Sequence, residues 1–453
     1  MSSTPTSHAC GRLAGLACSL VLLTGLPARA QDLLSAYRFA ADDDRRLAAS
    51  AAQVQASRAR HQESLAASRP QVLARLGTSW SHESYRDPQQ TDRYNANGYG
   101  VVLTQSLLDR ASDVQQDQAA IGTEYTELRR LIAAQERRLR VAKSYIGVLQ
   151  AQARERALDV QLAASEAQRD RVQRMAQAGS ATQPDVEEAQ ARVDLARAQC
   201  LAAKSDRELQ LASLRQAAGA TFSPNTELRP DAVLQPPQPE SIEQWVDAAR
   251  QDNLELRAAL LASRLAAREI DKQRAAGLPT VQLFGLHGRL SQHGGIIFGM
   301  PVPSNRVTQT TIGLQLTLPL ATGGAIDART QQAVANRQYS EDMAEEARRQ
   351  AALSARQAFT SVSTGLERVH AEQRAMASAQ ATLRSTQAAF EVGKRLSSDV
   401  LNAQQQLASA EQRWQQARYD TLLAQLQLKA TVGALDEAEL ARVSSVLSPV
   451  GTP

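Results

Sequence analysis

The feature that most constrains this chain is a duplication of its own sequence. A set of glycine, aspartate and small or apolar residues recurs 214 residues further on, without a gap. Gly179, Asp185, Val186, Ala189, Gln190, Ala196, Ala203, Asp206, Leu209, Leu214 and Gly219 return as Gly393, Asp399, Val400, Ala403, Gln404, Ala410, Ala417, Asp420, Leu423, Leu428 and Gly433. Recurrence at one offset predicts two tandem copies of one long structural unit.

Each copy is predicted to contain a long helical hairpin. Between Ser112 and Ala178 there is no Pro and only two Gly, and a helix of that length would be on the order of 100 Å long. Gly179 and Gly393 suit the left-handed residue that ends a helix. Asp185 and Asp399 suit the start of the next helix, where a carboxylate accepts free backbone amides and meets the positive end of the helix dipole.

The second helix of each hairpin has an apolar seam with 3,4 spacing, as in a coiled coil. The seam residues are Val186, Ala189, Val193, Ala196, Cys200 and Ala203 in the first copy, and Val400, Ala403, Leu407, Ala410, Trp414, Ala417, Thr421, Ala424 and Leu428 in the second. Cys200 is therefore interpreted as a packed seam residue and not as a reactive thiol.

Two strand-like segments precede each hairpin. Apolar residues alternate with polar or small ones in Val72–Trp80, Tyr99–Leu107 and Thr311–Leu320, as in a strand with one apolar face. The segment Pro279–Leu290 alternates poorly, and we expect Phe284 and Leu286 to share an outward face. All four are near the ~10 residues that a tilted strand needs to cross an outer membrane.

Composition agrees with a mainly helical protein. Aromatic residues are 4% of the 453 residues, and Gly and Pro number 23 and 16, which disfavours an all-β fold. Removing residues 1–30 takes away Arg12 and Arg29 and no acidic residue, so the formal charge falls from +4 to +2. This balance gives no support to nucleic-acid binding. No phosphate-binding loop, nucleophile elbow or metal-binding His pair is present, so we expect no enzyme, cofactor or metal site.

The chain is predicted to divide into five parts. Residues 1–30 have the polar start, apolar core and Ala-Arg-Ala end of a secretory signal peptide. The rest divides into a first repeat at 31–222, a Pro-rich linker at 223–240, a second repeat at 241–435 and a C-terminal tail at 436–453. Each repeat is expected to run helix, strand, strand and helical hairpin, with the leading helices at roughly 32–68 and 241–276, the strands at about 70–108 and 279–320, and the hairpin turns at 179–185 and 393–399.

Four membrane strands cannot form a closed barrel, because an open sheet in lipid leaves edge amides and carbonyls unpaired. Strands must therefore be pooled between chains. If three chains each supply four strands, they form a 12-stranded β-barrel wide enough for water, and their long helices form a second, helical tube. The expected fold is mainly α with a membrane β part.

Several motifs resemble those of the TolC family of outer-membrane efflux and secretion channels. Phe390–Arg395 followed by Asp399–Gln404 is similar to the family's hairpin signature. Leu278–Val281, and Leu318–Leu320 with Gly323 and Gly324, are similar to its strand-entry and strand-exit motifs. The resemblance covers about residues 32–435 and is specific because the order of elements, the duplication and the turn residues agree.

The resemblance implies a homotrimer in the outer membrane of a Gram-negative cell, with a helical barrel that reaches across the periplasm. It implies a passive conduit that docks to a periplasmic adaptor of the membrane-fusion type and to an inner-membrane pump. A cysteine directly after the signal is absent, which favours type I secretion of a protein such as a toxin, through an ABC transporter. The alternative is multidrug efflux, with a proton-driven pump.

The resemblance also implies a gate at the hairpin tips. Asp399 matches a carboxylate that rings the entrance, Asn402 stands where a second acidic ring is common, and Arg395 and Asp185 match residues that tie the closed tips. Phe390 and Pro184 replace a Tyr and a Thr, so two of the family's hydrogen bonds are expected to be missing. The expected adaptor-docking residues are Gly179, Thr182, Pro184, Gly393, Leu396 and Ser397. Helix capping alone is the alternative role for Asp185 and Asp399.

Two other classes of protein share some of these features. A periplasmic adaptor would have one long hairpin within a small β domain, whereas this chain has two hairpins and four amphipathic segments. A structural coiled-coil protein would explain the helices and leave the alternating segments without a purpose. The channel class therefore explains the sequence best.

Overall fold

A computed structural model of the chain describes residues 32–41, 44–86, 89–219, 222–292, 296–297, 300–301 and 305–449. The predicted signal peptide, residues 1–30, lies outside these residues. The helices are α1 (Leu33–Ala41), α2 (Arg45–Ala66), α3 (Arg110–Gln177), α4 (Gln183–Ala218), α5 (Ile242–Asp252), α6 (Leu254–Ala275), α7 (Ala325–Glu391), α8 (Ser397–Thr431) and α9 (Glu437–Ser445). The strands are β1 (Gln71–Arg86), β2 (Gln89–Leu108), β3 (Thr226–Leu228), β4 (Thr280–Gln292), β5 (Ile296–Ile297), β6 (Met300–Pro301), β7 (Asn305–Thr317) and β8 (Leu447–Pro449).

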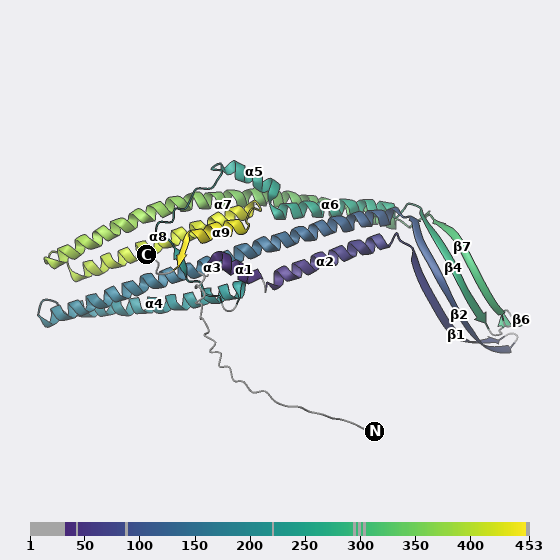
Figure 1. Cartoon of the computed structure of the whole chain (residues 1–453), viewed down its shortest axis with the longest axis horizontal. Helices are drawn as coiled ribbons and strands as arrows, with labels where there is room; N and C mark the ends of the chain where they lie inside the picture. The colour runs from purple at the N-terminus through teal and green to yellow at the C-terminus, as the bar shows by residue number, and fades with distance from the viewer. Residues whose placement is uncertain are drawn as a thin grey trace, which may run out of the picture.

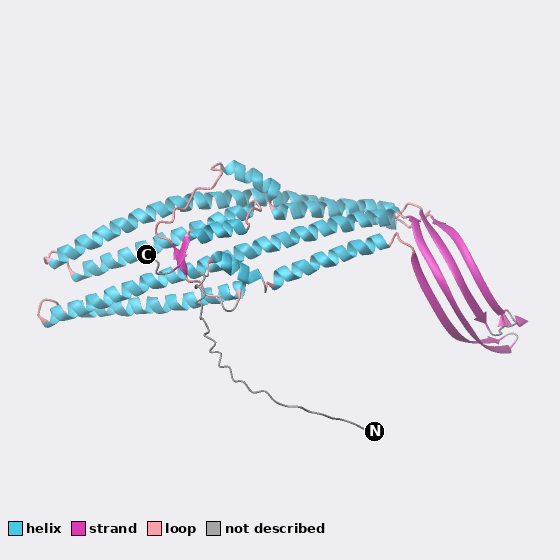
Figure 2. Ribbon diagram, viewed as in Figure 1, coloured by secondary structure: helices cyan, strands magenta, loops and turns pink. Residues whose placement is uncertain are grey.

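The molecule is a long helical body with a β-sheet at one end (Figure 1). Two helices dominate it, α3 with 68 residues and α7 with 67. α3 turns back as α4 and α7 turns back as α8, and both hairpin turns lie at the end of the body opposite the sheet (Figure 2). Within the described part of the chain, no helix is both long and apolar enough to cross a membrane.

The sheet is antiparallel, with the strand order β1-β2-β4-β7. Residues that pair directly across antiparallel strands point to the same side, so the register assigns each side chain to a face. One face, called here the apolar face, carries an almost continuous band of apolar side chains near the helices. Its members are Val72, Ala74, Leu76 and Trp80 of β1, Tyr99, Val101 and Leu103 of β2, Val281 and Leu283 of β4, and Ile312, Leu314 and Leu316 of β7. Most of these are exposed, and Ile312 is 79% exposed.

The opposite face carries most of the sheet's glycines and is called here the glycine face. Gly77, Gly98, Gly100, Gly288 and Gly313 belong to it by register. Larger side chains of β4 cover some of these glycines: a Cβ on Gly313 would lie 2.8 Å from the ring of Phe284, and one on Gly98 would lie 3.2 Å from Leu290. Small residues on one face allow a sheet to curve toward that face.

Phe284 and Leu286 share one face, as expected, but this is the glycine face and not the face of the apolar band. Phe284 pairs with Gly313 and Leu286 with Thr311, whereas Ile312 pairs with Gly285. The residues of β4 that belong to the apolar band are the odd-numbered Val281 and Leu283. The physical reason is register, because a shift of one residue moves every side chain to the other face.

The helices next to the sheet repeat the order of the strands. α2 packs on α3, α3 on α6, and α6 on α7, and these helices continue into or out of β1, β2, β4 and β7 respectively. Both layers therefore end in open edges, α2 with β1 on one side and α7 with β7 on the other. Among the described residues, no strand pairs with the outer edge of β1 or β7.

Each leading helix is divided, whereas one continuous helix was expected. The first region forms α1 and α2, and Asp44 caps α2 by accepting the backbone N–H groups of Arg46 and Leu47. The second region divides at Asn253, whose extended backbone ends α5 and whose side chain accepts the N–H of Leu256 at 3.0 Å. Asp and Asn compete for backbone amides in this way, and so they start new helices.

The largest core lies midway along the body, where α1, α9, the end of α4 and the segment after it pack on α3 and α8. The connecting segment is held by buried polar contacts. The hydroxyls of Tyr145 and Thr226 are 2.5 Å apart, and the hydroxyl of Tyr419 accepts the N–H of Leu228 at 3.3 Å. Arg418, only 2% exposed, donates to the carbonyl of Arg229. The linker therefore joins the two hairpins firmly, and β3 pairs with β8 of the tail.

Candidate functional site at the hairpin tips

The two hairpin turns have the same backbone geometry. Gly179 and Gly393 have φ of 73° and 74°, a region that side chains other than glycine rarely adopt. In the first turn the N–H of Ser180 donates to Met175 and that of Gly179 to Ala176; in the second, Lys394 donates to Ala389 and Gly393 to Phe390. This crossed pair of bonds closes a helix end around a left-handed residue.

In the first turn, Asp185 holds the start of α4. Thr182 is the N-cap residue, Pro184 occupies the first turn of the helix, and Asp185 follows it. One oxygen of Asp185 accepts both the N–H of Thr182 at 2.8 Å and its hydroxyl at 2.6 Å. These bonds favour the charged form and lower the pKa of the Asp185 carboxyl below its ordinary value.

In the second turn, Asp399 has a different set of partners. It accepts the N–H of Leu396 at 3.2 Å, and because Leu396 stands where Thr182 does, no hydroxyl is offered. Arg395 lies 3.6 Å from Asp399 and supplies a positive charge instead. Ser397 begins α8, and Phe390 lies half-buried in the last turn of α7.

The predicted site residues thus form two groups, one on each turn. Thr182, Pro184 and Asp185 lie together on the first, and Arg395, Leu396 and Asp399 on the second. Within this chain, Asp185 and Arg395 are each bonded to their own turn. Both turns lie at the same end of the molecule, as separate tips (Figure 1).

A link between the two hairpins was missed by the sequence reasoning. Arg192 of α4 donates to Gln405 at 2.8 Å and to Asn402 at 3.1 Å, both on α8. Glu188, one turn earlier on α4, lies 3.6 Å from the same guanidinium. Asn402 is therefore a partner of α4 in this chain. No local pattern marks this pair, because Arg192 and Asn402 are 210 positions apart in the chain.

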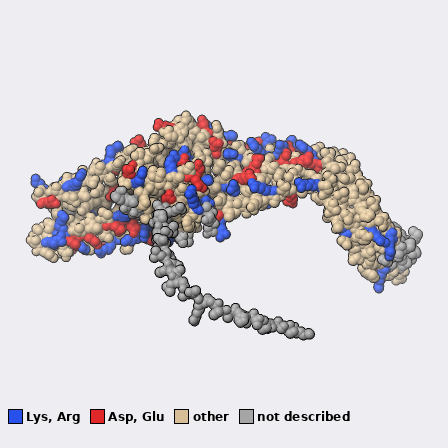
Figure 3. All heavy atoms as spheres, in the orientation of Figure 1, with Lys and Arg blue, Asp and Glu red and all other residues tan. Residues whose placement is uncertain are grey.

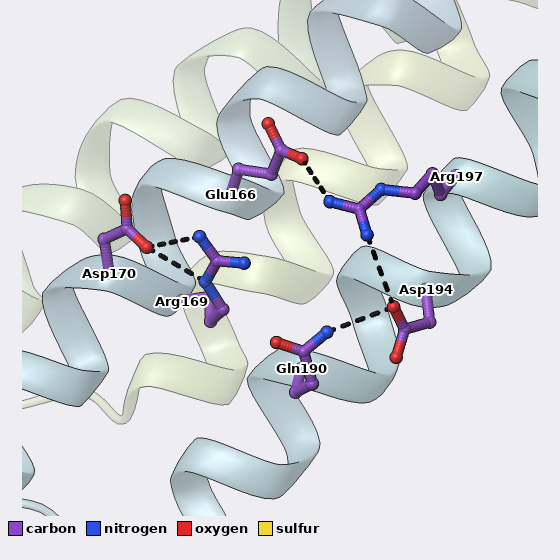
Figure 4. Close-up of polar contacts among 6 residues, drawn as sticks. All are labelled: Glu166, Arg169, Asp170, Gln190, Asp194 and Arg197. Atoms are coloured by element: carbon purple, nitrogen blue, oxygen red, sulfur yellow. Dashed lines mark hydrogen bonds and ion pairs between the residues drawn. The ribbon is translucent and has the colours of Figure 1, made fainter.

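Polar contacts also join α3 and α4 near the tip of the first hairpin (Figure 4). Arg197 of α4 donates to Glu166 of α3 at 2.8 Å and lies 3.9 Å from Asp194 on its own helix. Gln190 donates to Asp194 at 3.0 Å, while Arg169 and Asp170 pair with each other on α3. The first hairpin is thus tied within itself by charged side chains, and Arg192 ties it to the second.

Comparison with protein families gives one match that covers most of the chain. The family model described as "Outer membrane efflux protein" matches residues 36–220 and 245–434. The two matched stretches contain the two hairpins and the four long strands. The gap between them falls in the connecting segment and the start of α5.

Individual relatives agree with this match. The chain is 28% identical to outer membrane protein TolC of Escherichia coli, over 94% of this chain and 87% of that protein. It is 27% identical to proteases secretion protein PrtF of Dickeya chrysanthemi, over 96% and 95%. The crystal structure of outer membrane protein VceC from Vibrio cholerae matches with a TM-score of 0.76, at 17% identity, over 90% of this chain and 98% of that one.

Proposed function

Because the chain belongs to the outer membrane efflux protein family, we propose that three copies assemble into a passive conduit leading from the periplasm to the exterior. The protein is an outer membrane channel of secretion or efflux in a Gram-negative cell. Its sheet lies in the membrane, its helical body extends into the periplasm, and its hairpin tips point toward the inner membrane. None of the three relatives described above is named as an enzyme.

The observation that carries closure through neighbouring copies is the pair of matching open edges. β7 runs antiparallel to β1, and so it can pair with β1 of a second copy as an ordinary antiparallel neighbour. Unpaired edge groups cost several kcal/mol each in lipid, so closure through neighbouring copies stabilises the sheet. The same operation brings α7 beside α2 of the next copy. Twelve strands and a helical tube follow from three copies.

The apolar face then turns toward lipid and the glycine face toward the lumen. This orientation agrees with the curvature expected from the glycines and with the apolar band. Phe284 and Leu286 consequently face the lumen.

We further propose that the hairpin tips form the periplasmic gate. Asp399 lines the entrance, where three carboxylates around the threefold axis attract cations and repel anions. Arg395, 3.6 Å away, offsets part of that charge. Asn402 and Phe390 lie on the two helices that flank this turn, and Asp185 holds the neighbouring turn. The tips at Gly179, Thr182, Pro184, Gly393, Leu396 and Ser397 are where a periplasmic adaptor docks.

The cargo is proposed to be a protein exported by type I secretion, with an inner-membrane ABC transporter as the energy source. Support comes from the relative named as a protease secretion protein, which matches over nearly its whole length. A complementation experiment distinguishes protein secretion from drug efflux. In a host that lacks its own channel, restored protein secretion without restored drug resistance supports the proposal, and the reverse result assigns the chain to drug efflux.

Assembly is tested on the purified full chain in detergent. Native mass spectrometry should give three copies, and planar bilayers should show ion-conducting channels. Paired cysteines, one on the outer edge of β1 and one on that of β7, should cross-link different copies. A single-copy mass together with no conductance would refute the conduit.

The gate is tested by single-channel selectivity with two substitutions of opposite sign. Asp399→Ala removes the carboxylates and should lower cation selectivity and block by divalent cations. Arg395→Ala removes the offsetting charge and should raise both. If both variants behave like the unmodified channel, Asp399 and Arg395 do not line the entrance.

A further inference from the structure

The apolar face carries basic side chains toward the distal ends of its four strands, away from the helices. By register, Arg86 of β1, Arg93 of β2, Arg289 of β4 and Arg306 of β7 share the face of the apolar band. All four are exposed. These four residues are called here the arginine belt.

Cross-strand side-chain contacts agree with this assignment. Arg93 donates through Nε to Nδ1 of His82 at 3.1 Å, and His82 belongs to the same face of β1 as Leu76 and Trp80. On the other strand pair, Nδ1 of His287 lies 2.8 Å from the hydroxyl of Thr310. The belt is therefore on the apolar face of the sheet and not on the glycine face.

Two aromatic residues of the apolar band lie beside the belt. Trp80 is 70% exposed, and it precedes His82 by two positions on the same face. Tyr99 pairs directly with Arg289. Aromatic side chains of this kind mark the boundary between the hydrocarbon and the headgroup region. Arg289 lies opposite Tyr99, and Arg93, which pairs with His82, lies beyond Trp80, so this part of the sheet combines the residue types of a headgroup boundary.

The charged residues of β4 and β7 are all basic. β4 and β7 contain Arg289 and Arg306 and no Asp or Glu within their bounds. Figure 3 shows Lys and Arg atoms at the distal end of the sheet, beyond a surface with few charges. Such a patch suits a multivalent anion, because guanidinium groups bind phosphate through paired, charge-assisted hydrogen bonds.

We propose that the arginine belt binds the phosphate groups of a phosphorylated glycolipid in the outer leaflet of the outer membrane. The helical body lies in the periplasm, so the distal end of the sheet faces the outer leaflet. A lipid A molecule places two phosphates on its sugar headgroup, directly above its acyl chains. Its acyl chains contact the apolar band, while its phosphates reach the belt.

This inference rests on the proposed closure of the sheet with the apolar face outward. The belt then surrounds the barrel and is contributed by every copy. Bound glycolipid would stabilise the assembled barrel at the level where the strands leave the membrane, as a ligand that binds only the folded form does.

The test measures binding of purified bisphosphorylated lipid A to the full-length protein in neutral detergent, by native mass spectrometry and by the shift in unfolding temperature. The triple variant Arg93→Gln, Arg289→Gln, Arg306→Gln should bind at least tenfold more weakly, and each single variant about fivefold more weakly. The matched control is Arg75→Gln, an exposed arginine of the same sheet that lies on the glycine face. It should bind like the unmodified protein.

Other ligands identify the chemistry that is recognised. Dephosphorylated lipid A, phosphatidylglycerol and inorganic phosphate should each bind at least tenfold more weakly than the bisphosphorylated form. Equal binding of any of them, or equal loss in Arg75→Gln and the triple variant, would overturn the inference.

The same native mass spectra also give the number of copies in the assembly, which is determined before the binding affinities are compared. A trimeric triple variant that keeps full affinity refutes the belt and leaves the conduit intact, whereas an unmodified chain that never forms trimers refutes the conduit. If the triple variant fails to assemble, the affinities of the three single variants are compared with that of Arg75→Gln instead.

Discussion

Residues at equivalent places in the two repeats have different partners. Asp185 accepts two bonds from Thr182, whereas Asp399 accepts one from the backbone of Leu396 and lies near Arg395. The first carboxylate is therefore engaged in capping, and the second keeps more of its bonding capacity for other groups. Cys200, in the seam of α4, is buried. Burial is the main cause that raises the pKa of its thiol, and the negative charge of nearby Asp159 raises it further.

The cap at Thr182 should make the first tip sensitive to acid. Since the folded pKa of Asp185 is lowered, its contribution is fully present above the unfolded pKa and is lost as the pH falls through the folded pKa. Thr182→Val removes the hydroxyl bond and brings the folded pKa of Asp185 closer to the unfolded one, so the loss should be smaller and complete at a higher pH. Hydrogen exchange of the 179–186 segment between about pH 3 and pH 7 measures this, after correction for intrinsic rates.

The second turn is the internal control for that experiment. Leu396→Val changes a residue that offers no hydroxyl, so the pH dependence of exchange at 393–400 should not change. An unaltered acid response of the first turn in Thr182→Val would show that the hydroxyl bond contributes nothing.

At the scale of elements, small residues determine how closely the long helices approach. Gly365 of α7 lies against Thr421 of α8, whose hydroxyl bonds the carbonyl of Ala417 at 2.7 Å. A Cβ on Gly365 would lie 2.6 Å from the Thr421 hydroxyl oxygen. At Gly122 of α3, by contrast, a Cβ would have nothing within 4 Å apart from its chain neighbours and the backbone of its own helix. One helical glycine is thus needed for packing and the other is not.

Gly365→Ala and Gly122→Ala should change stability in opposite directions. Gly365→Ala should cost about 1–3 kcal/mol, because the buried crossing is overpacked. Gly122→Ala should stabilise the protein by up to about 1 kcal/mol, through higher helix propensity. Urea unfolding of the helical body, followed by circular dichroism, measures both. A neutral Gly365→Ala would mean that the α7–α8 crossing can move apart without cost.

The contact between the two hairpins should depend on the guanidinium group of Arg192, which donates to two residues of α8. Arg192→Ala should weaken the coupling of α4 to α8 by on the order of 1 kcal/mol, as two partly exposed hydrogen bonds are lost. Arg192→Lys should rescue only part, because an ammonium lacks the planar fork. A double-mutant cycle with Gln405→Ala, read by hydrogen exchange at the tips, gives the coupling.

Arg197→Ala serves as the control, since it breaks contacts within the first hairpin and spares the link to α8. If it disturbs α8 as strongly as Arg192→Ala does, the link is not specific to Arg192.

At the scale of the whole molecule, one chain has two open sheet edges and two sheet faces of different composition. Both features are expected of a protomer that forms part of a closed barrel. The helices α2, α3, α6 and α7 lie side by side in the same order as the strands β1, β2, β4 and β7. The rotation that places the next copy beside β7 therefore also places it beside α7. Neighbouring residues of the same strand consequently meet opposite environments. Ile312 belongs to the apolar face and Thr311 to the glycine face.

Arginine at these two positions should have unequal effects. Ile312→Arg should cost up to about 4 kcal/mol, because it places a charge on the lipid face, and it should lower the yield of folded protein in the outer membrane. Thr311→Arg should be tolerated and should instead reduce cation conductance, because it adds charge to the lumen. Similar yields for both variants would show that the apolar face is not in lipid.

The sequence by itself determined the duplication, the long hairpins and the left-handed turns at Gly179 and Gly393, because these depend on local backbone preferences and on spacing along one chain. It also indicated the alternating strands and the family. Only the tertiary structure decided which face Phe284 occupies, that Asn402 bonds Arg192, and that four arginines share one side of the sheet. Such relations depend on strand register and on contacts between residues about 200 positions apart, as between Arg192 and Asn402, and no local periodicity records them.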